Sequence, residues 1–190
     1  MVTKTNDTKE AILKIGAELI QQVGYHAFSY ADIAKKLSIK NAAVHYHFST
    51  KADLYESIVD AHIENYTQIG QQLREAAIPA KAKLEKIFDR YTNLVDCNHI
   101  CVIGAIASDY TTLPEKTRAR VATLVELVLK LVEKTLQEGK KNAEFTFTET
   151  PRVQTLLIMT NLSAGVQLAR ITGKKDFDTI RKSILKQLAP

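Results

Sequence analysis

The stretch that decides the fold is Phe28–Leu54, which reads FSYADIAKKLSIKNAAVHYHFSTKADL. Ser29 with Asp32 three residues later is a capping-box pattern, and it predicts the start of a short helix. Thr50 with Asp53 repeats the pattern and predicts the start of a longer helix. Between these two starts the chain has room for a tight turn and one helix of about two turns. This arrangement predicts a helix-turn-helix unit, whose second short helix would enter the major groove of DNA.

A small core is expected inside this unit. Val44 and Phe48 on the second short helix, with Ile33 and Leu37 on the first, are predicted to be buried. Ala34 has the small side chain that a close approach of two helices requires. The other residues of the second short helix remain for contacts with DNA.

The rest of the chain also predicts helices, because glycine and proline are scarce (7 and 4 of 190 residues) and apolar residues between them recur at three- and four-residue spacing. The first predicted helix begins at Asp7 or Thr8 and ends at Gly24, with Val23 on its apolar face, and the unit's third helix has Ala61 on its apolar side. Further helices are predicted through Leu84 and Tyr91, over Val102–Tyr110, from Pro114 to near Gly139, from Pro151 to Gly173, and from Phe177 to Leu188. We therefore predict an all-α chain of about nine helices. The last two have wide apolar faces that a second copy of the same pair would cover, which predicts a homodimer through these helices.

Composition excludes several classes of protein. With 45% apolar and 25% charged residues, the chain is typical of globular rather than disordered or fibrous proteins. The net charge of +5 permits a polyanionic partner but does not demonstrate one. No signal peptide is expected, and the longest apolar run, of eight residues at 100–107, is too short to span a membrane. Two cysteines suit a reducing compartment, so a cytoplasmic location without membrane contact is expected.

Residues from Thr8 to about Asp60 resemble the TetR family of transcriptional repressors. The resemblance rests on several short elements in the family's order and spacing: Val23-Gly24-Tyr25, Ser29 with Asp32-Ile33-Ala34, Val44 through Phe48, and Lys51 with Leu54. Two positions depart from the family pattern: Ser38 stands where a turn glycine is usual, and His45 where an aromatic residue is usual. A left-handed backbone at Ser38 would cost free energy that glycine avoids.

The resemblance implies a helix-turn-helix DNA-binding domain over residues 6–66 and a ligand-binding and dimerisation domain over 67–190. It implies a repressor that binds a palindromic operator in double-stranded DNA as a dimer. Carried over by position, the DNA-binding residues are Ser29, Lys40, Asn41, Ala42, Ala43, His45, Tyr46, His47 and Lys51. Asn41 would read an adenine edge or hold a phosphate, the alanines would touch a thymine methyl, and Ser29 and Lys51 would hold phosphates. Each of Tyr25, Tyr30 and Tyr46 is as readily a packing residue as a contact residue.

The family resemblance also implies a small-molecule effector that binds in the C-terminal domain, residues 67–190. Its binding would move the two DNA-binding domains of the dimer, residues 6–66 of each chain, apart. The expected ligand-binding residues are Phe88, Tyr91, Cys101, Tyr110, Met159 and Asn161, chosen because they are polar or aromatic points on otherwise apolar helices. Each of them is also readily explained as ordinary core.

Cys97, His99 and Cys101 leave three interpretations open. A closed zinc site needs four ligands, and the chain has no further cysteine, so we predict no metal. Buried, inert thiols are the ordinary outcome. The third interpretation is a redox or electrophile sensor, since Cys101 at the start of the helix predicted over Val102–Tyr110 would have a lowered thiol pKa.

The competing class of function is a helical-bundle enzyme or metal-binding protein without DNA-binding activity. The sequence contains no paired Glu-x-x-His motif, phosphate loop or nucleophile motif. We therefore predict a DNA-binding regulator that is not an enzyme and needs no cofactor.

Overall fold

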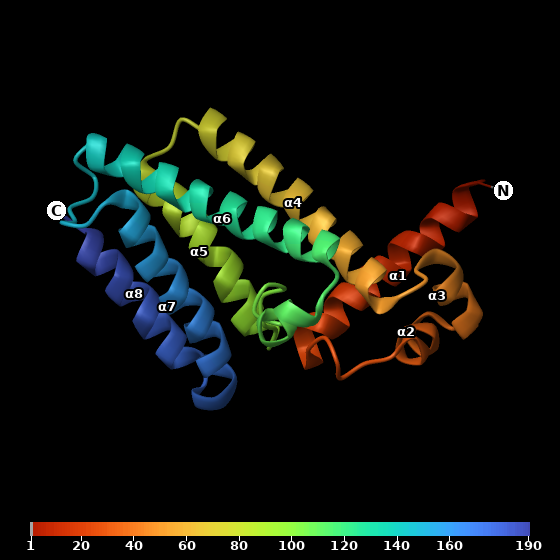
Figure 1. Ribbon diagram of the computed structural model, residues 1–190. Coiled ribbons are helices and arrows are strands. Elements are labelled where there is room, and N and C mark those ends of the chain that lie inside the picture. The colour runs from red at the N-terminus through yellow and green to blue at the C-terminus, as the bar shows by residue number, and fades with distance from the viewer. Residues whose placement is uncertain (1) are drawn as a thin grey trace. The chain divides into compact units, whose positions relative to one another are not determined.

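The computed structural model describes residues 2–190, with side chains from Asp7 onward. Eight α-helices and one 3₁₀ helix make up its regular structure, and the described residues contain no strand (Figure 1). The elements are α1 (Val2–Val23), α2 (Tyr30–Leu37), α3 (Asn41–His47), α4 (Lys51–Glu75), α5 (Ala80–Asp96), the 3₁₀ helix η1 (Ala107–Thr112), α6 (Glu115–Lys141), α7 (Pro151–Thr172) and α8 (Lys174–Leu188). The prediction of an all-α chain of about nine helices is confirmed. None of the described helices is both long and apolar enough to cross a bilayer.

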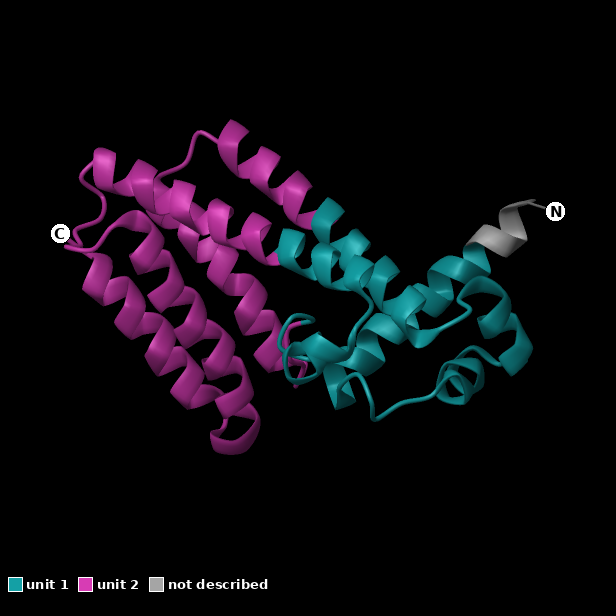
Figure 2. Ribbon diagram, viewed as in Figure 1, with its two compact units in different colours: residues 1–64, 102–124 teal, residues 65–101, 125–190 magenta. Residues whose placement is uncertain are grey.

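The chain divides into two compact units (Figure 2). The first contains the residues up to Glu64 together with Val102–Leu124, and the second contains Asn65–Cys101 and Val125–Pro190. Each of α4 and α6 has residues in both units, so neither unit is one continuous stretch of sequence. The domains expected from the sequence, 6–66 and 67–190, divide the chain differently and stay a prediction.

In the first unit, α1 packs on α2, α3 and the start of α4. Gly16 makes the last contact possible, because a Cβ there would lie 3.0 Å from the Leu54 side chain. The start of α4 also holds residues 102–124: the Tyr55 hydroxyl donates to the Val102 carbonyl at 3.0 Å, and Arg120 pairs with Asp60. The helix-turn-helix segment is therefore held in place by buried contacts with α1, and the start of α4 by contacts with residues 102–124.

In the second unit, α7 packs along α8, and both contact α5. Phe177 of α8 is fully buried, and a Cβ at Gly165 of α7 would lie 3.3 Å from its ring. Thr150 caps α7 by accepting from the Val153 N–H, with Pro151 at the first helical position as predicted. Residues 142–150 form the loop between α6 and α7.

Several local predictions were wrong. The helix α1 starts at Val2 rather than at Asp7 or Thr8, and its predicted apolar residue Val23 is 50% exposed. On α4, Ala61 is exposed rather than buried.

The helix predicted over Val102–Tyr110 is also absent. Residues 102–106 form turns, and η1 follows. The bonds there, Ile106 N–H to Ile103 O and Asp109 N–H to Ile106 O, span three residues, and such 3₁₀ bonding is used in short pieces. Gly104 and the following serine, aspartate and threonines favour turns over a helix interior, which explains the difference.

Candidate DNA-binding site

The turn between α2 and α3 is closed by a serine in a left-handed conformation. Ser38 has φ 54° and ψ 39°, the region that glycine usually occupies after a helix. Its N–H donates to the Lys35 carbonyl, and the Ile39 N–H donates to the Ala34 carbonyl at 3.0 Å. The departure at Ser38 therefore leaves the turn intact and places α3 directly after it.

Both predicted capping pairs form. Thr50 and Asp53 bond reciprocally, from the Thr50 N–H to the carboxylate at 2.9 Å and from the Asp53 N–H to the threonine hydroxyl at 3.1 Å. At α2, the Ser29 N–H and hydroxyl both donate to Asp32 at 2.7 Å. These bonds from Ser29 lower the pKa of Asp32, helped by nearby lysine charges. Because the Ser29 hydroxyl has one proton, and Asp32 accepts it, Ser29 would have to rotate away to donate to a phosphate.

One face of α3 is buried and the other is exposed. Val44 is fully buried, and Phe48, which follows the helix, is 3% exposed, as predicted. The predicted contact residues on the other face differ in exposure: Lys40, Asn41, Ala42, His45 and Tyr46 are exposed, whereas Ala43 and His47 are half-buried.

The three tyrosines considered as contact residues, Tyr25, Tyr30 and Tyr46, differ in exposure. Tyr46 is 79% exposed on α3, which is unusual for a large apolar ring. Tyr25 and Tyr30 are buried, and burial raises the pKa of both. Of these three rings, only that of Tyr46 is therefore open to solvent.

A hollow of about 330 Å³ gathers four of the predicted residues: Ser29, Asn41, His45 and Lys51. Tyr30, Ala31 and Ser49 complete its lining, and no sequence pattern indicates Ala31 or Ser49. The His45 ring stands edge-on to Tyr30, with 4.8 Å between centroids. Packing against the buried Tyr30 restricts the rotamers of His45. The histidine that departs from the family pattern therefore has a defined position on the lining of the hollow.

Lys51 is less available for a phosphate contact than its sequence position suggests. Its ammonium donates to the Phe28 carbonyl and lies 4.1 Å from the centroid of the Phe28 ring and 5.2 Å from that of Tyr25. Burial lowers its pKa. Nearby, the Tyr30 hydroxyl donates to the Thr50 carbonyl. Lys51 thus holds the start of α4 to the segment before α2, a role that sequence reasoning missed because the partners are 23 residues apart.

The predicted ligand-binding residues fall in both compact units. Phe88, Tyr91 and Met159 are buried in the second unit, and Asn161 is exposed with its amide donating to the Leu157 carbonyl. Tyr110 belongs to the first unit and donates to the Arg118 carbonyl. These assignments stay predictions.

Cys101 is half-buried and is followed by turns, so it does not lie at the N-terminus of a helix as predicted. Among the residues with described side chains, no three histidine, cysteine or carboxylate groups come together as metal ligands.

Comparison with known proteins agrees with this geometry. Residues 12–58 match the family model described as "Bacterial regulatory proteins, tetR family", and residues 80–182 match "Tetracyclin repressor-like, C-terminal domain". The chain belongs to the TetR family. It is a transcriptional regulator with a DNA-binding helix-turn-helix, in a family of regulators rather than enzymes.

Two solved structures show the same fold over nearly the whole chain. A TetR transcriptional regulator from Legionella pneumophila is 29% identical with a TM-score of 0.84, covering 95% of this chain and 97% of that one. A TetR-family regulator from Agrobacterium tumefaciens is 24% identical with a TM-score of 0.90, covering 98% and 100%.

Among curated relatives, the biofilm operon icaADBC negative transcriptional regulator IcaR of Staphylococcus aureus is 31% identical over 86 residues, 43% of this chain and 46% of IcaR. The alignments to the curated relatives thus span about half of the relatives' length.

Proposed function

We propose that this TetR-family chain is a repressor that binds a palindromic operator as a homodimer and is released by a small molecule. The observation that carries the DNA-binding part is the exposed face of α3, opposite the buried Val44 and supported by two capped helices. Of the curated relatives, IcaR is named as a negative transcriptional regulator and FasR of Mycolicibacterium smegmatis as an activator; repression is the mode of IcaR, which at 31% against 21% is the more identical of the two. Access to chromosomal DNA requires the cytoplasmic location that the sequence analysis expects.

On the operator, Asn41 would pair with an adenine edge or a phosphate, and Ala42 or Ala43 would contact a thymine methyl. Lys40, Tyr46 and His47 would bond phosphates, with Ser29 and Lys51 at the hollow beside them. Ser29 and Lys51 would first have to exchange their bonds inside the chain. The strongest base-reading candidate is therefore Asn41, which is exposed at the first position of α3.

An exposed apolar stripe on α7 supports the homodimer. Five large apolar side chains on this helix are between 39% and 86% exposed: Val153, Leu156, Leu157, Leu168 and Ile171. Their spacing keeps them within one broad face of the helix. A two-fold dimer has two α3 helices, and helix-turn-helix dimers bind half-sites in successive major grooves about 34 Å apart, so the dimer would require a palindromic site.

Selection of bound sequences from random duplex DNA tests the proposal. Enrichment of an inverted repeat with half-sites one helical turn apart is expected, with no enrichment for Asn41→Ala and full enrichment for Lys35→Ala as a matched surface control. Light scattering should give a mass near twice the 21.2 kDa of one chain. A monomer, or enrichment of a single unrepeated half-site, would contradict the dimeric reading.

Modification of Cys101 is the other route of release considered from the sequence. The structure gives it less support than a small molecule, since no helix follows the half-buried thiol. Alkylation of the wild-type protein and of Cys101→Ser separates the two routes. Loss of DNA affinity in the wild type alone would establish the cysteine route.

A further inference from the structure

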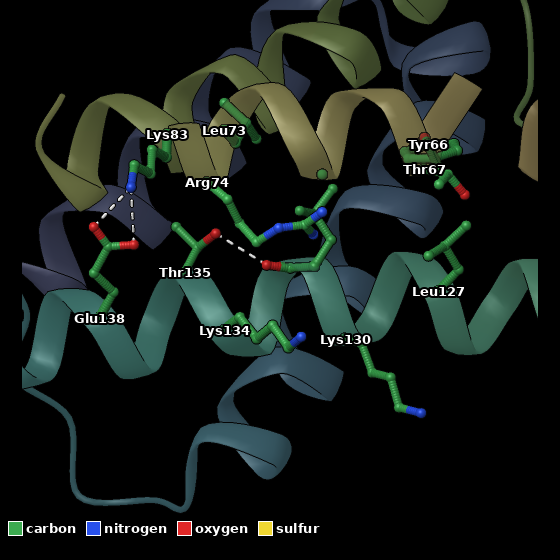
Figure 3. A pocket seen from close by; sticks show the side chains of 12 residues that line it. Tyr66, Thr67, Leu73, Arg74, Lys83, Leu127, Lys130, Lys134, Thr135 and Glu138 are labelled. Atoms are coloured by element: carbon green, nitrogen blue, oxygen red, sulfur yellow. Dashed lines mark hydrogen bonds and ion pairs between the residues drawn. The ribbon is translucent and has the colours of Figure 1, made fainter. Parts of the chain in front are cut away.

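A cavity of about 160 Å³ lies in the second unit, lined by residues of α4, α5 and α6 (Figure 3). Its apolar walls come from three leucines, Leu73 of α4 and Leu127 and Leu131 of α6, with the ring of Tyr66. None of the residues predicted from the sequence to bind a ligand lines it. The cavity therefore has to be interpreted from its own residues.

Two of the four cations on the lining, Arg74 and Lys134, have no carboxylate partner among the described side chains. Among the described side chains, no ion pair forms with Arg74, which Figure 3 shows pointing from α4 toward α6. By contrast, Lys83 is 6% exposed and is neutralised by Glu138, at 2.7 and 3.0 Å from its two carboxylate oxygens. Lys130 points away from α4 and lies 3.7 Å from Glu126. The guanidinium of Arg74 is thus the charge that the cavity offers to a ligand, with Lys134 as a second cation on its lining.

Gly70 keeps space open next to this guanidinium. A Cβ at Gly70 would lie 3.5 Å from an Arg74 Nη and 3.7 Å from the Leu131 side chain. A glycine inside a long helix costs about 1 kcal/mol relative to alanine, so a role in packing or function is expected for it. Here the missing side chain leaves room between the guanidinium and the apolar wall.

Most of the other polar groups of the lining already have partners. The Thr135 hydroxyl donates to the Leu131 carbonyl at 2.9 Å. The ring of Tyr66 lies 4.7 Å below the Arg90 guanidinium, and its hydroxyl is hydrogen-bonded to Tyr91. A ligand with several hydroxyl groups would leave them unsatisfied in this cavity, at a cost in affinity. The body of the ligand is therefore apolar.

We propose that this cavity binds a small amphiphilic carboxylate, with the carboxylate on Arg74 and the apolar body between the leucines of α4 and α6. Arginine matches the geometry of a carboxylate with two parallel N–H donors. The volume is close to the roughly 150 Å³ that holds one benzene molecule, so the body is about one ring or a short alkyl chain. This inference rests on the proposed release by a small molecule and names the chemical class of that molecule.

Calorimetric and NMR titrations of the full-length protein test the inference, with benzoate and the C4 to C8 fatty acids as probes and benzamide and hexanamide as neutral counterparts. The carboxylates should bind and the amides should bind at least tenfold more weakly. Arg74→Gln should weaken carboxylate binding about five- to tenfold, a range reduced because Arg74 is exposed. Lys86→Gln, an exposed charge of α5 outside the cavity, is the matched control and should leave binding unchanged.

Gly70→Leu tests the location, because its side chain would fill the cavity from α4. This variant should abolish carboxylate binding while its melting profile shows a folded protein. Equal binding of amides and carboxylates, unchanged binding to Gly70→Leu, or no binding of any probe up to about 10 mM would overturn the inference.

The same titrations repeated on the operator complex keep the two proposals apart. Carboxylate binding that leaves DNA affinity unchanged upholds the cavity and refutes release by this class of ligand. An effector that releases DNA equally from wild type and Gly70→Leu upholds ligand-responsive repression and overturns the assignment of this cavity.

Discussion

Replacing Lys40 with alanine is expected to weaken binding to all DNA sequences and to flatten the dependence of affinity on salt. Lys40 is exposed at the N-cap of α3, and no ion pair forms with it among the described side chains. Each lysine that neutralises a phosphate contributes about 0.9 to the slope of log affinity against log salt concentration. A dimer loses two such contacts, so the slope should become shallower by about 1.8. Between 50 and 200 mM salt, the deficit of the variant should therefore shrink by about twelvefold.

Fluorescence anisotropy of a labelled operator at several salt concentrations measures this slope. Lys35→Ala removes another exposed charge, from α2, and serves as the control, with the wild-type slope expected. Lys51→Ala should change the slope less than Lys40→Ala and lower the melting temperature more, because the Lys51 ammonium is bonded to the Phe28 carbonyl. An unchanged slope for Lys40→Ala, or an equal change for Lys35→Ala, would refute the assignment of Lys40 to a phosphate.

Four further substitutions test the fold and the dimer. Ser38→Gly should raise the melting temperature by about 2 °C in calorimetry, since it removes the left-handed strain at φ 54°, and a fall would show that the serine side chain stabilises the turn. Gly139→Ala should lower stability by about 1–3 kcal/mol in urea unfolding, because its Cβ would lie 2.0 Å from the buried Phe145 ring; a neutral effect would mean that the ring moves freely. Asp32→Asn should lower the melting temperature at pH 7 and not below about pH 4. The depressed pKa of Asp32 gives stability that is present above its unfolded pKa and is lost as pH falls through the folded pKa. A constant difference in melting temperature between pH 3 and pH 7 would contradict the capping role. Ile171→Glu, at a side chain 86% exposed, should yield a folded monomer with weakened operator binding, and a dimer by light scattering would exclude this part of α7 from the interface.

Local patterns predicted the helix-turn-helix well because its determinants are close in sequence. The capping pairs lie three residues apart, and the burial of Val44 and Phe48 follows from a four-residue spacing within one short segment. The apolar run at Val102–Tyr110 predicts a helix wrongly, because the glycine, serine and aspartate within it favour the turns and 3₁₀ helix that the structure forms.

The cavity was beyond sequence reasoning for a different reason. Arg74 and Leu131 lie 57 positions apart (131 minus 74) on different helices, and no periodic pattern indicates that these helices face each other there. The predicted ligand residues were chosen as polar or aromatic points on apolar helices, and that criterion passes over a glycine and an exposed arginine. The same limit explains Lys51, whose sequence position indicates a surface lysine but whose partner carbonyl lies 23 residues earlier.

The charge of residues 1–60, the N-terminal head that contains the helix-turn-helix, bears on how the protein would distinguish its operator from other DNA. Residues 1–60 contain seven lysines and seven carboxylates, so this part of the chain is neutral overall. One of those lysines, Lys51, is already bonded inside the chain. Since attraction to DNA of any sequence depends on cations that meet phosphates, this head should bind non-specific DNA weakly. On the proposed function, discrimination would then depend on the exposed polar side chains of α3. His45, which lines the same hollow as Asn41, packs edge-on against the buried Tyr30, so it would lose little side-chain entropy on binding.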